Sequence, residues 1–157
     1  MKLRNKEKGL VINIEDSLVE KLCRYGISHY PKEFGGLLKG HYIDDNKAVV
    51  ISETVLPSEY KSSKFSFERG SKGLKKVLEK LYKQTPPLIY VGEWHTHPDN
   101  PAVPSGTDMK ALQEIVKDER VFINNPILLI ISICKGKCEP EFYVYIRNKV
   151  YRYEEEK

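Results

Sequence analysis

Apolar and polar residues follow first a strand pattern and then a helical one near the start of the chain. Residues Leu10–Ile14 have the pattern of a β-strand. The sequence Ser17–Glu20 is that of a capping box, which predicts that a helix begins there. Gly26 predicts the end of this helix, because glycine readily adopts the left-handed conformation that closes many helices. The apolar face of the helix holds three residues: Leu18, Leu22 and Tyr25.

Three strands are expected next. Leu37–Ile43 and Ala48–Leu56 are strand-like, and the Asp44-Asp45-Asn46 sequence between them is typical of a hairpin turn. Phe65 and Phe67 alternate with polar residues and indicate a short third strand. This part of the chain therefore predicts a hairpin followed by one further strand.

The second half of the chain continues with helices and strands. The clearest helical pattern covers Ser71–Gln84, where apolar residues recur at spacings of three and four. A further helix is expected after Ser105. Ile127–Cys134 is almost wholly apolar, which is typical of a central strand buried on both faces. The other expected strands are Leu88–Trp94, Phe142–Ile146 and Val150–Tyr153. The order of these helices and strands along the chain predicts an α/β (mixed α+β) fold, in which a mixed sheet is flanked by about three helices.

Length and composition narrow the class of protein. A chain of 157 residues suits a single domain, since domains typically run about 100–200 residues. The net charge of +4 is small, so no nucleic-acid partner is expected. The longest apolar run, Ile127–Ile131, is far shorter than the ~18 residues of a membrane span, and no secretory signal is evident. With an odd count of 3 cysteines, this composition favours the reducing cytoplasm.

Two of the cysteines are close in sequence. Cys134-Lys-Gly-Lys-Cys138 has a spacing that suits a metal or disulfide site. Its Lys-Gly-Lys centre lies between two strand-like runs, so a hairpin turn is the favoured interpretation.

The side chains that could bind a metal or take part in catalysis are concentrated in one segment of the sequence. His95-Thr96-His97-Pro98 is followed by six residues and then by Ser105-Gly106-Thr107-Asp108. Side chains at i and i+2 of a strand point to the same face, about 6–7 Å apart, so His95 and His97 can face one cation. Ser105 has the chemistry of a helix N-cap, which places Asp108 in the first turn of the next helix. All three side chains can therefore point at the same ion.

Two histidines and one aspartate with an open fourth position are typical of a catalytic zinc site, in which zinc lowers the pKa of its water to about 7. The alternative is two unconnected histidines beside an ordinary capping serine. The His-Glu-x-x-His pattern of other zinc proteases and the cysteine motif of nucleobase deaminases are both absent. His29 and His41 are the remaining histidines, and an exposed or hydrogen-bonded role is favoured over a fourth ligand for each.

A water nucleophile also needs a general base, and two residues qualify. Glu93 shares the expected strand face of His95 and His97. Glu33 lies before Gly35-Gly36, where glycine allows the backbone to approach a site closely. The periodicity of the sequence does not choose between the two glutamates.

These residues resemble the JAMM (MPN-type) metalloprotease family, whose motif is an upstream Glu, His-x-His-Pro, six residues, and Ser-x-x-Asp. The resemblance covers residues 10–153 and implies a curved mixed sheet with a zinc site at a strand–loop–helix junction. It implies that His95, His97 and Asp108 bind one Zn²⁺. It also implies that Glu33 is the base and that Ser105 hydrogen-bonds the oxyanion, which leaves Glu93 a supporting role.

The resemblance further implies hydrolysis after the C-terminal Gly of a ubiquitin-like protein, as deconjugation or precursor processing. The sequence around the histidines is most similar to the prokaryotic branch, which includes deconjugating peptidases of bacterial conjugation operons and CBASS antiphage systems. The implied partners are the ubiquitin-like protein, its conjugates and E1/E2-like enzymes of the same operon. The alternatives are a hydrolase that releases an amino acid or peptide from a sulfur-carrier protein, and a non-catalytic MPN scaffold.

Overall fold

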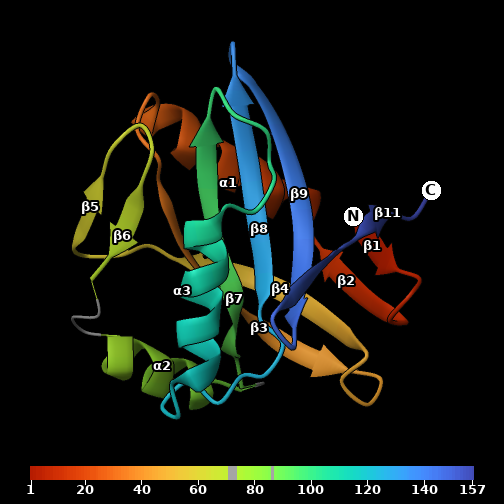
Figure 1. Ribbon diagram of the computed structural model, residues 1–157. Coiled ribbons are helices and arrows are strands. Elements are labelled where there is room, and N and C mark those ends of the chain that lie inside the picture. Colours follow the sequence, from red (N-terminus) through yellow and green to blue (C-terminus); the bar gives the residue numbers. More distant parts are fainter. Residues whose placement is uncertain (71–73, 86) are drawn as a thin grey trace.

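The computed structural model describes residues 1–70, 74–85 and 87–157, and its main element is a mixed nine-stranded sheet (Figure 1). The strand order across the sheet is β10-β9-β8-β7-β3-β4-β2-β1-β11. The strands are β1 (Lys2–Asn5), β2 (Leu10–Ile14), β3 (Gly35–Ile43), β4 (Ala48–Val55), β7 (Ile89–Pro98), β8 (Ile127–Cys134), β9 (Lys137–Ile146), β10 (Lys149–Arg152) and β11 (Glu154–Glu155). A separate hairpin consists of β5 (Tyr60–Ser62) and β6 (Phe67–Arg69).

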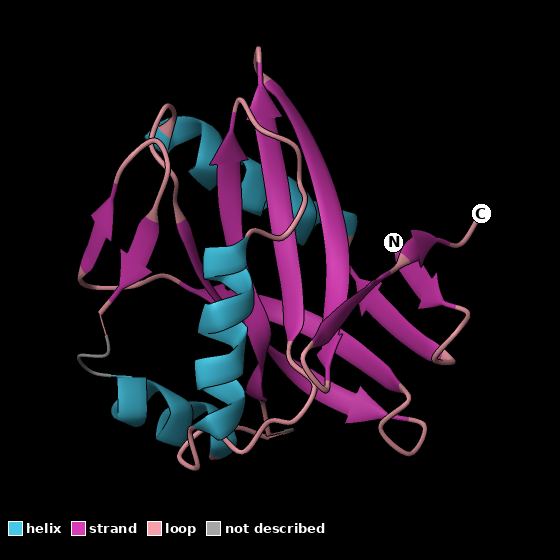
Figure 2. Ribbon diagram, in the orientation of Figure 1, coloured by secondary structure: helices cyan, strands magenta, loops and turns pink. Residues whose placement is uncertain are grey.

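The helices of the described residues are α1 (Asp16–His29), α2 (Leu74–Tyr82) and α3 (Gly106–Lys117). Figures 1 and 2 show α1 behind the long strands of the sheet and α3 in front of them. The central strand β8 separates the two helices, as its apolar sequence predicts. This arrangement confirms the expected mixed α/β fold, with a sheet that twists strongly from β9 to β1 (Figure 2).

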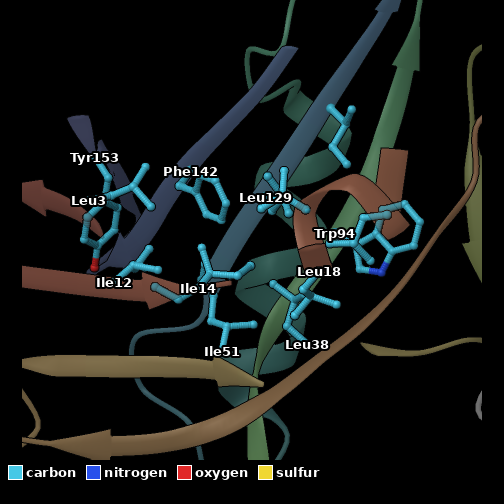
Figure 3. Close-up of a cluster of buried hydrophobic side chains, with 14 of the residues drawn as sticks. Leu3, Ile12, Ile14, Leu18, Leu38, Ile51, Trp94, Leu129, Phe142 and Tyr153 are labelled. Carbon is cyan, nitrogen blue, oxygen red and sulfur yellow. The ribbon is translucent and has the colours of Figure 1, made fainter. Parts of the chain in front are cut away.

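Alternate residues of β8 enter two different cores. Leu129, Ile131 and Ile133 join the main cluster, which includes Leu18 and Leu22 of α1. On the other face, Leu128 and Ile130 pack with Leu112 of α3. Figure 3 shows the main cluster, to which Trp94 of β7, Leu38 of β3 and Leu129 of β8 all contribute. Because both faces of β8 are covered, its neighbour β7 is held firmly where it carries the two motif histidines.

Helix α1 differs from the sequence prediction at both ends. It begins at Asp16 after the N-cap residue Glu15, and the cap makes no side-chain hydrogen bond, so the predicted capping box at Ser17–Glu20 is wrong. Gly26 does not end the helix either, because α1 continues to His29. A Cβ atom at Gly26 would lie 2.6 Å from Ile133 Cδ1 and 2.7 Å from Thr96 Cγ2. Glycine is present here because α1 packs closely on the sheet.

The short strands also differ from the prediction. Phe67 lies in β6, but Phe65 lies in the turn before it, with a 78% exposed side chain. Three strands were not predicted: β5, which pairs with β6, the polar strand β1, which pairs with β2, and β11, which pairs with β1. Of the helix predicted at Ser71–Gln84, residues 71–73 lie outside the described residues, and the observed α2 ends at Tyr82.

Both predicted hairpin turns are confirmed. Asp44, Asp45 and Asn46 have φ angles of 52°, 54° and 65° and join β3 to β4. In the Cys134–Cys138 segment, Cys134 pairs with Lys137 across a turn, and all three cysteines are free. The segment Cys134–Cys138 therefore forms a hairpin turn, and its two cysteines are not joined by a disulfide. No helix of the described segments is both long and apolar enough to span a bilayer.

Candidate active site

Strand β7 presents both motif histidines on one face. His95 lies opposite Gly35 of β3, and His97 lies beside Ser132 of β8. A Cβ atom at Gly35 would lie only 2.1 Å from the Trp94 carbonyl oxygen. Glycine is therefore required for β3 to approach β7 at this point, and this close approach brings the segment before β3 to the histidines.

The N-terminus of α3 supplies the third side chain of the motif. Ser105 is the N-cap, and its Oγ accepts a hydrogen bond of 3.1 Å from the Asp108 amide. Asp108 Oδ2 in turn accepts a hydrogen bond of 2.8 Å from the Ser105 amide. This reciprocal capping box confirms the predicted start of the helix and fixes the Asp108 carboxylate in the first turn.

The three side chains converge on one point. His95 Nε2 lies 3.2 Å from Asp108 Oδ1, His97 Nε2 lies 3.3 Å from Asp108 Oδ2, and the two Nε2 atoms are 3.1 Å apart. Two atoms that each bind one tetrahedral zinc ion at about 2.0–2.1 Å lie about 3.3 Å from one another. The side chains are only 12%, 10% and 14% exposed. The cluster therefore has the donor atoms, spacing and burial that a metal ion needs.

His97 is oriented by its second ring nitrogen. Nδ1 lies 2.8 Å from the carbonyl oxygen of Pro101. A carbonyl only accepts hydrogen bonds, so Nδ1 carries the proton of the neutral ring and Nε2 keeps a lone pair for the cluster. The sequence analysis did not identify Pro101, because its contribution is a backbone carbonyl and has no residue signature.

The pKa shifts in the cluster have opposite signs. Burial by itself raises the pKa of Asp108, but hydrogen bonds from His95 and His97 outweigh it and hold the pKa well below the usual range. Burial by itself lowers the pKa of His97, but the hydrogen bonds to Asp108 and to the Pro101 carbonyl raise it above the usual value. Without a metal, the cluster thus favours an ionised Asp108 carboxylate beside a His97 ring that binds a proton more readily than usual.

Glu33 lies at the edge of the same cluster. Burial raises the pKa of its carboxyl, His95 and His97 oppose the rise, and Asp108 adds to it. The Glu33 backbone is held by the β5–β6 hairpin, since its amide donates to the Ser63 carbonyl at 2.8 Å and its carbonyl accepts from the Ser62 hydroxyl. The structure therefore brings a half-buried carboxyl of raised pKa to the candidate metal ligands.

Two other candidates from the sequence, Glu93 and His29, make contacts elsewhere, whereas Nδ1 of His41 is buried without a hydrogen-bond partner in the part of the chain that the structure describes. Glu93 accepts a hydrogen bond of 2.7 Å from Arg69 Nε and forms an ion pair with the same guanidinium. His29 stacks on Phe34 with 3.7 Å between ring centroids, and its Nδ1 contacts the Tyr25 carbonyl. Neither His29 nor His41 belongs to the His95–His97–Asp108 group found among the described residues.

Comparison with known proteins now decides the family. A family model described as prokaryotic homologs of the JAB domain matches residues 15–145. The chain belongs to this family. It is a metallopeptidase of the JAB/MPN type, as the resemblance to JAMM proteases predicts.

Two relatives and one solved structure agree with this assignment. The CD-NTase/cGAS isopeptidase of Enterobacter hormaechei is 31% identical over 122 residues, which are 77% of this chain and 67% of that protein. A protein of Sinorhizobium fredii named "Probable metalloprotease y4qB" is 27% identical over 128 residues, 80% of this chain and 77% of that protein. The fold matches the solution structure of DSY2949 from Desulfitobacterium hafniense, with a TM-score of 0.68 at 20% identity over 90% of this chain and 88% of that one.

Proposed function

We propose that this JAB-family metallopeptidase is a zinc-dependent isopeptidase that cleaves after the C-terminal Gly of a ubiquitin-like protein. The observation that carries the proposal is the convergence of His95, His97 and Asp108, whose ligand atoms lie 3.1–3.3 Å apart. The relative named a CD-NTase/cGAS isopeptidase supports a protein conjugate as substrate. A role in antiphage defence is part of the proposal.

In this proposal His95 Nε2, His97 Nε2 and one Asp108 oxygen would hold the zinc ion. Bound zinc supplies Lewis-acid chemistry, polarising the scissile carbonyl and making water acidic enough to attack it near neutral pH. The His97–Pro101 hydrogen bond keeps the His97 ring in the tautomer that leaves Nε2 free.

Glu33 is the proposed general base. Its carboxylate takes a proton from the attacking water and returns it to the nitrogen of the leaving amine. The raised pKa of Glu33 suits this exchange, because a carboxyl whose pKa lies nearer to neutrality both accepts and donates a proton more readily. The contact of the Glu93 carboxylate with Arg69 supports the choice of Glu33 over Glu93 as the proposed base.

Ser105 is the proposed oxyanion donor. Its Oγ already accepts a hydrogen bond from the Asp108 amide, so the hydroxyl hydrogen remains available to donate to a third partner. A donor aimed at the carbonyl oxygen stabilises the negative charge that develops as the tetrahedral intermediate forms. The same serine therefore caps α3 and serves the reaction.

The proposed setting is a cytoplasmic conjugation system of bacteria. The partners are a ubiquitin-like protein with a C-terminal Gly tail, its conjugates and E1/E2-like enzymes. A sulfur-carrier protein with a small C-terminal extension is the alternative substrate. The scaffold alternative is disfavoured because all three ligands and the base are present.

The test is cleavage of ubiquitin-like proteins fused to a reporter after Gly-Gly, with zinc-loaded protein, chelated protein and His97→Ala. We expect release by the zinc-loaded protein alone. Release by chelated protein or by His97→Ala would contradict the metal site. If release occurs only from a sulfur carrier bearing a small adduct, the alternative substrate is correct.

A further inference from the structure

We infer that Thr96, the residue between the two motif histidines, is a positioning residue that sets Glu33 relative to His95 and His97. The inference rests on the proposed function in one respect, namely that Glu33 is the base. It assigns Thr96 no contact with substrate or metal. The Thr96 side chain lies on the face of β7 opposite the two histidines.

Thr96 joins the strand of the histidines to the residue next to Glu33 through two hydrogen bonds. The Thr96 amide donates to the Phe34 carbonyl at 2.8 Å, and the Phe34 amide donates to Thr96 Oγ1 at 2.9 Å. Thr96 is 0% exposed and Phe34 is 3% exposed, so water does not replace either bond. Losing the hydroxyl would leave the Phe34 amide buried without that partner.

These bonds lie where the regular pairing of β3 with β7 starts. Gly35 pairs with His95, and the Thr96–Phe34 contact extends the pairing by one residue toward Glu33. The acceptor for the Phe34 amide is a side-chain hydroxyl in place of a backbone carbonyl. The approach of Glu33 to the histidines therefore depends on the identity of the side chain at position 96.

Packing holds the Thr96 side chain in a single orientation. Its methyl group faces Gly26 of α1, where an added Cβ atom would lie 2.7 Å from Thr96 Cγ2. A β-branched side chain has few rotamers, so close packing of the methyl group directs the hydroxyl to Phe34. Phe34 is itself fixed between rings, with centroids 3.7 Å from His29 and 5.9 Å from Trp94.

The Glu33 backbone is thus held on two sides. Ser62 and Ser63 of the hairpin bind the peptide groups of Glu33 itself, and Thr96 binds those of the next residue. Loss of the Thr96 hydroxyl would remove one of the two hydrogen bonds to Phe34 and would leave the hairpin contacts of Glu33 in place. We therefore expect a displaced base with an intact metal site, which is a kinetic signature different from that of a metal-ligand variant.

The test compares Thr96→Val, which keeps the shape and removes the hydroxyl, with Thr96→Ser, which keeps the hydroxyl and removes the methyl group. For Thr96→Val we expect a kcat about 10–100-fold lower, because small misplacements of a catalytic group have effects of this size. KM and zinc affinity should stay within about threefold of wild type, since the ligands themselves are unchanged. Thr96→Ser should keep kcat within about fivefold of wild type.

Three results would overturn the inference: an unchanged kcat in Thr96→Val, an equal loss of kcat in both variants, or a loss of zinc affinity parallel to the loss of kcat. If Thr96→Val does not fold, Thr96→Ala replaces it, because alanine and serine differ only by the hydroxyl. Rescue of kcat by Thr96→Ser over Thr96→Ala is then the expected result, and equal activity of the two would refute the inference.

Hydrogen exchange at the Phe34 amide separates this inference from the proposed function, since it needs no substrate. We expect faster exchange in Thr96→Val than in wild type, and unchanged exchange at Ile130 and Ile131 in β8. Unchanged exchange at Phe34 would refute the Thr96 contact even in an active enzyme. If wild type cleaves none of the fusions while Phe34 exchange rises in Thr96→Val, the proposed function fails and the positioning contact stands.

Discussion

The imidazole of His97 is anchored by the carbonyl oxygen of Pro101, which lies 2.8 Å from Nδ1 and four residues further along the chain. The loop that carries this carbonyl is tied to β8 and β9 on both sides of Pro101. The Ser132 hydroxyl donates to the Asn100 carbonyl at 2.7 Å, and the Tyr143 hydroxyl donates to the Ala102 carbonyl at 2.6 Å. The orientation of His97 therefore depends on residues remote from the motif.

Tyr143→Phe tests this dependence. The change removes the hydrogen bond to the buried Ala102 carbonyl, so the loop at Pro101 should loosen and zinc affinity should fall by about 10-fold. Competition with a chromogenic chelator measures the affinity. Tyr145→Phe is the matched control, because Tyr145 lies in the same strand and core cluster but donates to Asn148. Equal zinc affinity in Tyr143→Phe and wild type would contradict the proposed anchor.

Ser105→Ala should affect both rate and stability. Loss of the oxyanion donor is expected to lower kcat by about 10²–10³-fold. Loss of the N-cap should lower the free energy of unfolding by about 1 kcal/mol, measured by denaturant titration. Ser17→Ala is the control, because Ser17 lies exposed inside α1 and does not cap it, so its loss should change stability little. Full activity in Ser105→Ala would contradict the oxyanion role.

Gly26→Ala tests the close packing of α1 on the sheet. Alanine favours a helix over glycine by about 1 kcal/mol. At position 26 its Cβ atom would collide with Ile133 and Thr96, so we expect net destabilisation of about 1–3 kcal/mol. Gly106→Ala is the matched control in α3, because nothing lies within 4 Å of its added Cβ atom. A stabilised Gly26→Ala protein would show that α1 packs less closely than the structure indicates.

The sequence alone was sufficient to predict the central strand and the candidate metal ligands. The apolar run Ile127–Cys134 predicts a strand covered on both faces, and the structure places α1 and α3 on those faces. The convergence of His95, His97 and Asp108 is also predictable, because strand alternation and the Ser105 cap depend on local sequence alone. Local patterns thus identified the central strand and the candidate ligands.

Other features depend on tertiary contacts that no local pattern contains. The polar strand β1 exists because β2 and β11 pair with it, and the extent of α1 past Gly26 depends on its contact with the sheet. The Pro101 carbonyl has no signature in the sequence. The residue pattern alone left Glu33 and Glu93 open as the base; the resemblance to JAMM proteases favoured Glu33, and the contact of Arg69 with Glu93 supports that proposal.

The cysteines should react at very different rates with an alkylating agent. Cys134 is exposed, whereas burial raises the pKa of the Cys23 thiol to about 12, with a contribution from its hydrogen bond with Cys138. A raised pKa leaves little thiolate at pH 8, so Cys23 should react at least about 100-fold more slowly than Cys134. Peptide mapping after iodoacetamide treatment measures both rates, because it reports Cys23 and Cys134 on separate peptides. Comparable rates at the two sites would contradict the burial of Cys23.

The most direct test of the account is the turnover of Glu33→Gln and Glu93→Gln on a ubiquitin-like protein extended after Gly-Gly, with zinc content measured for each. Glu33→Gln removes the proposed base and should lower kcat by at least about 10²-fold while zinc stays bound. Glu93→Gln alters the ion pair with Arg69 and should keep kcat within about fivefold of wild type. Near-native turnover by zinc-loaded Glu33→Gln would contradict the account, most decisively if Glu93→Gln were the inactive variant.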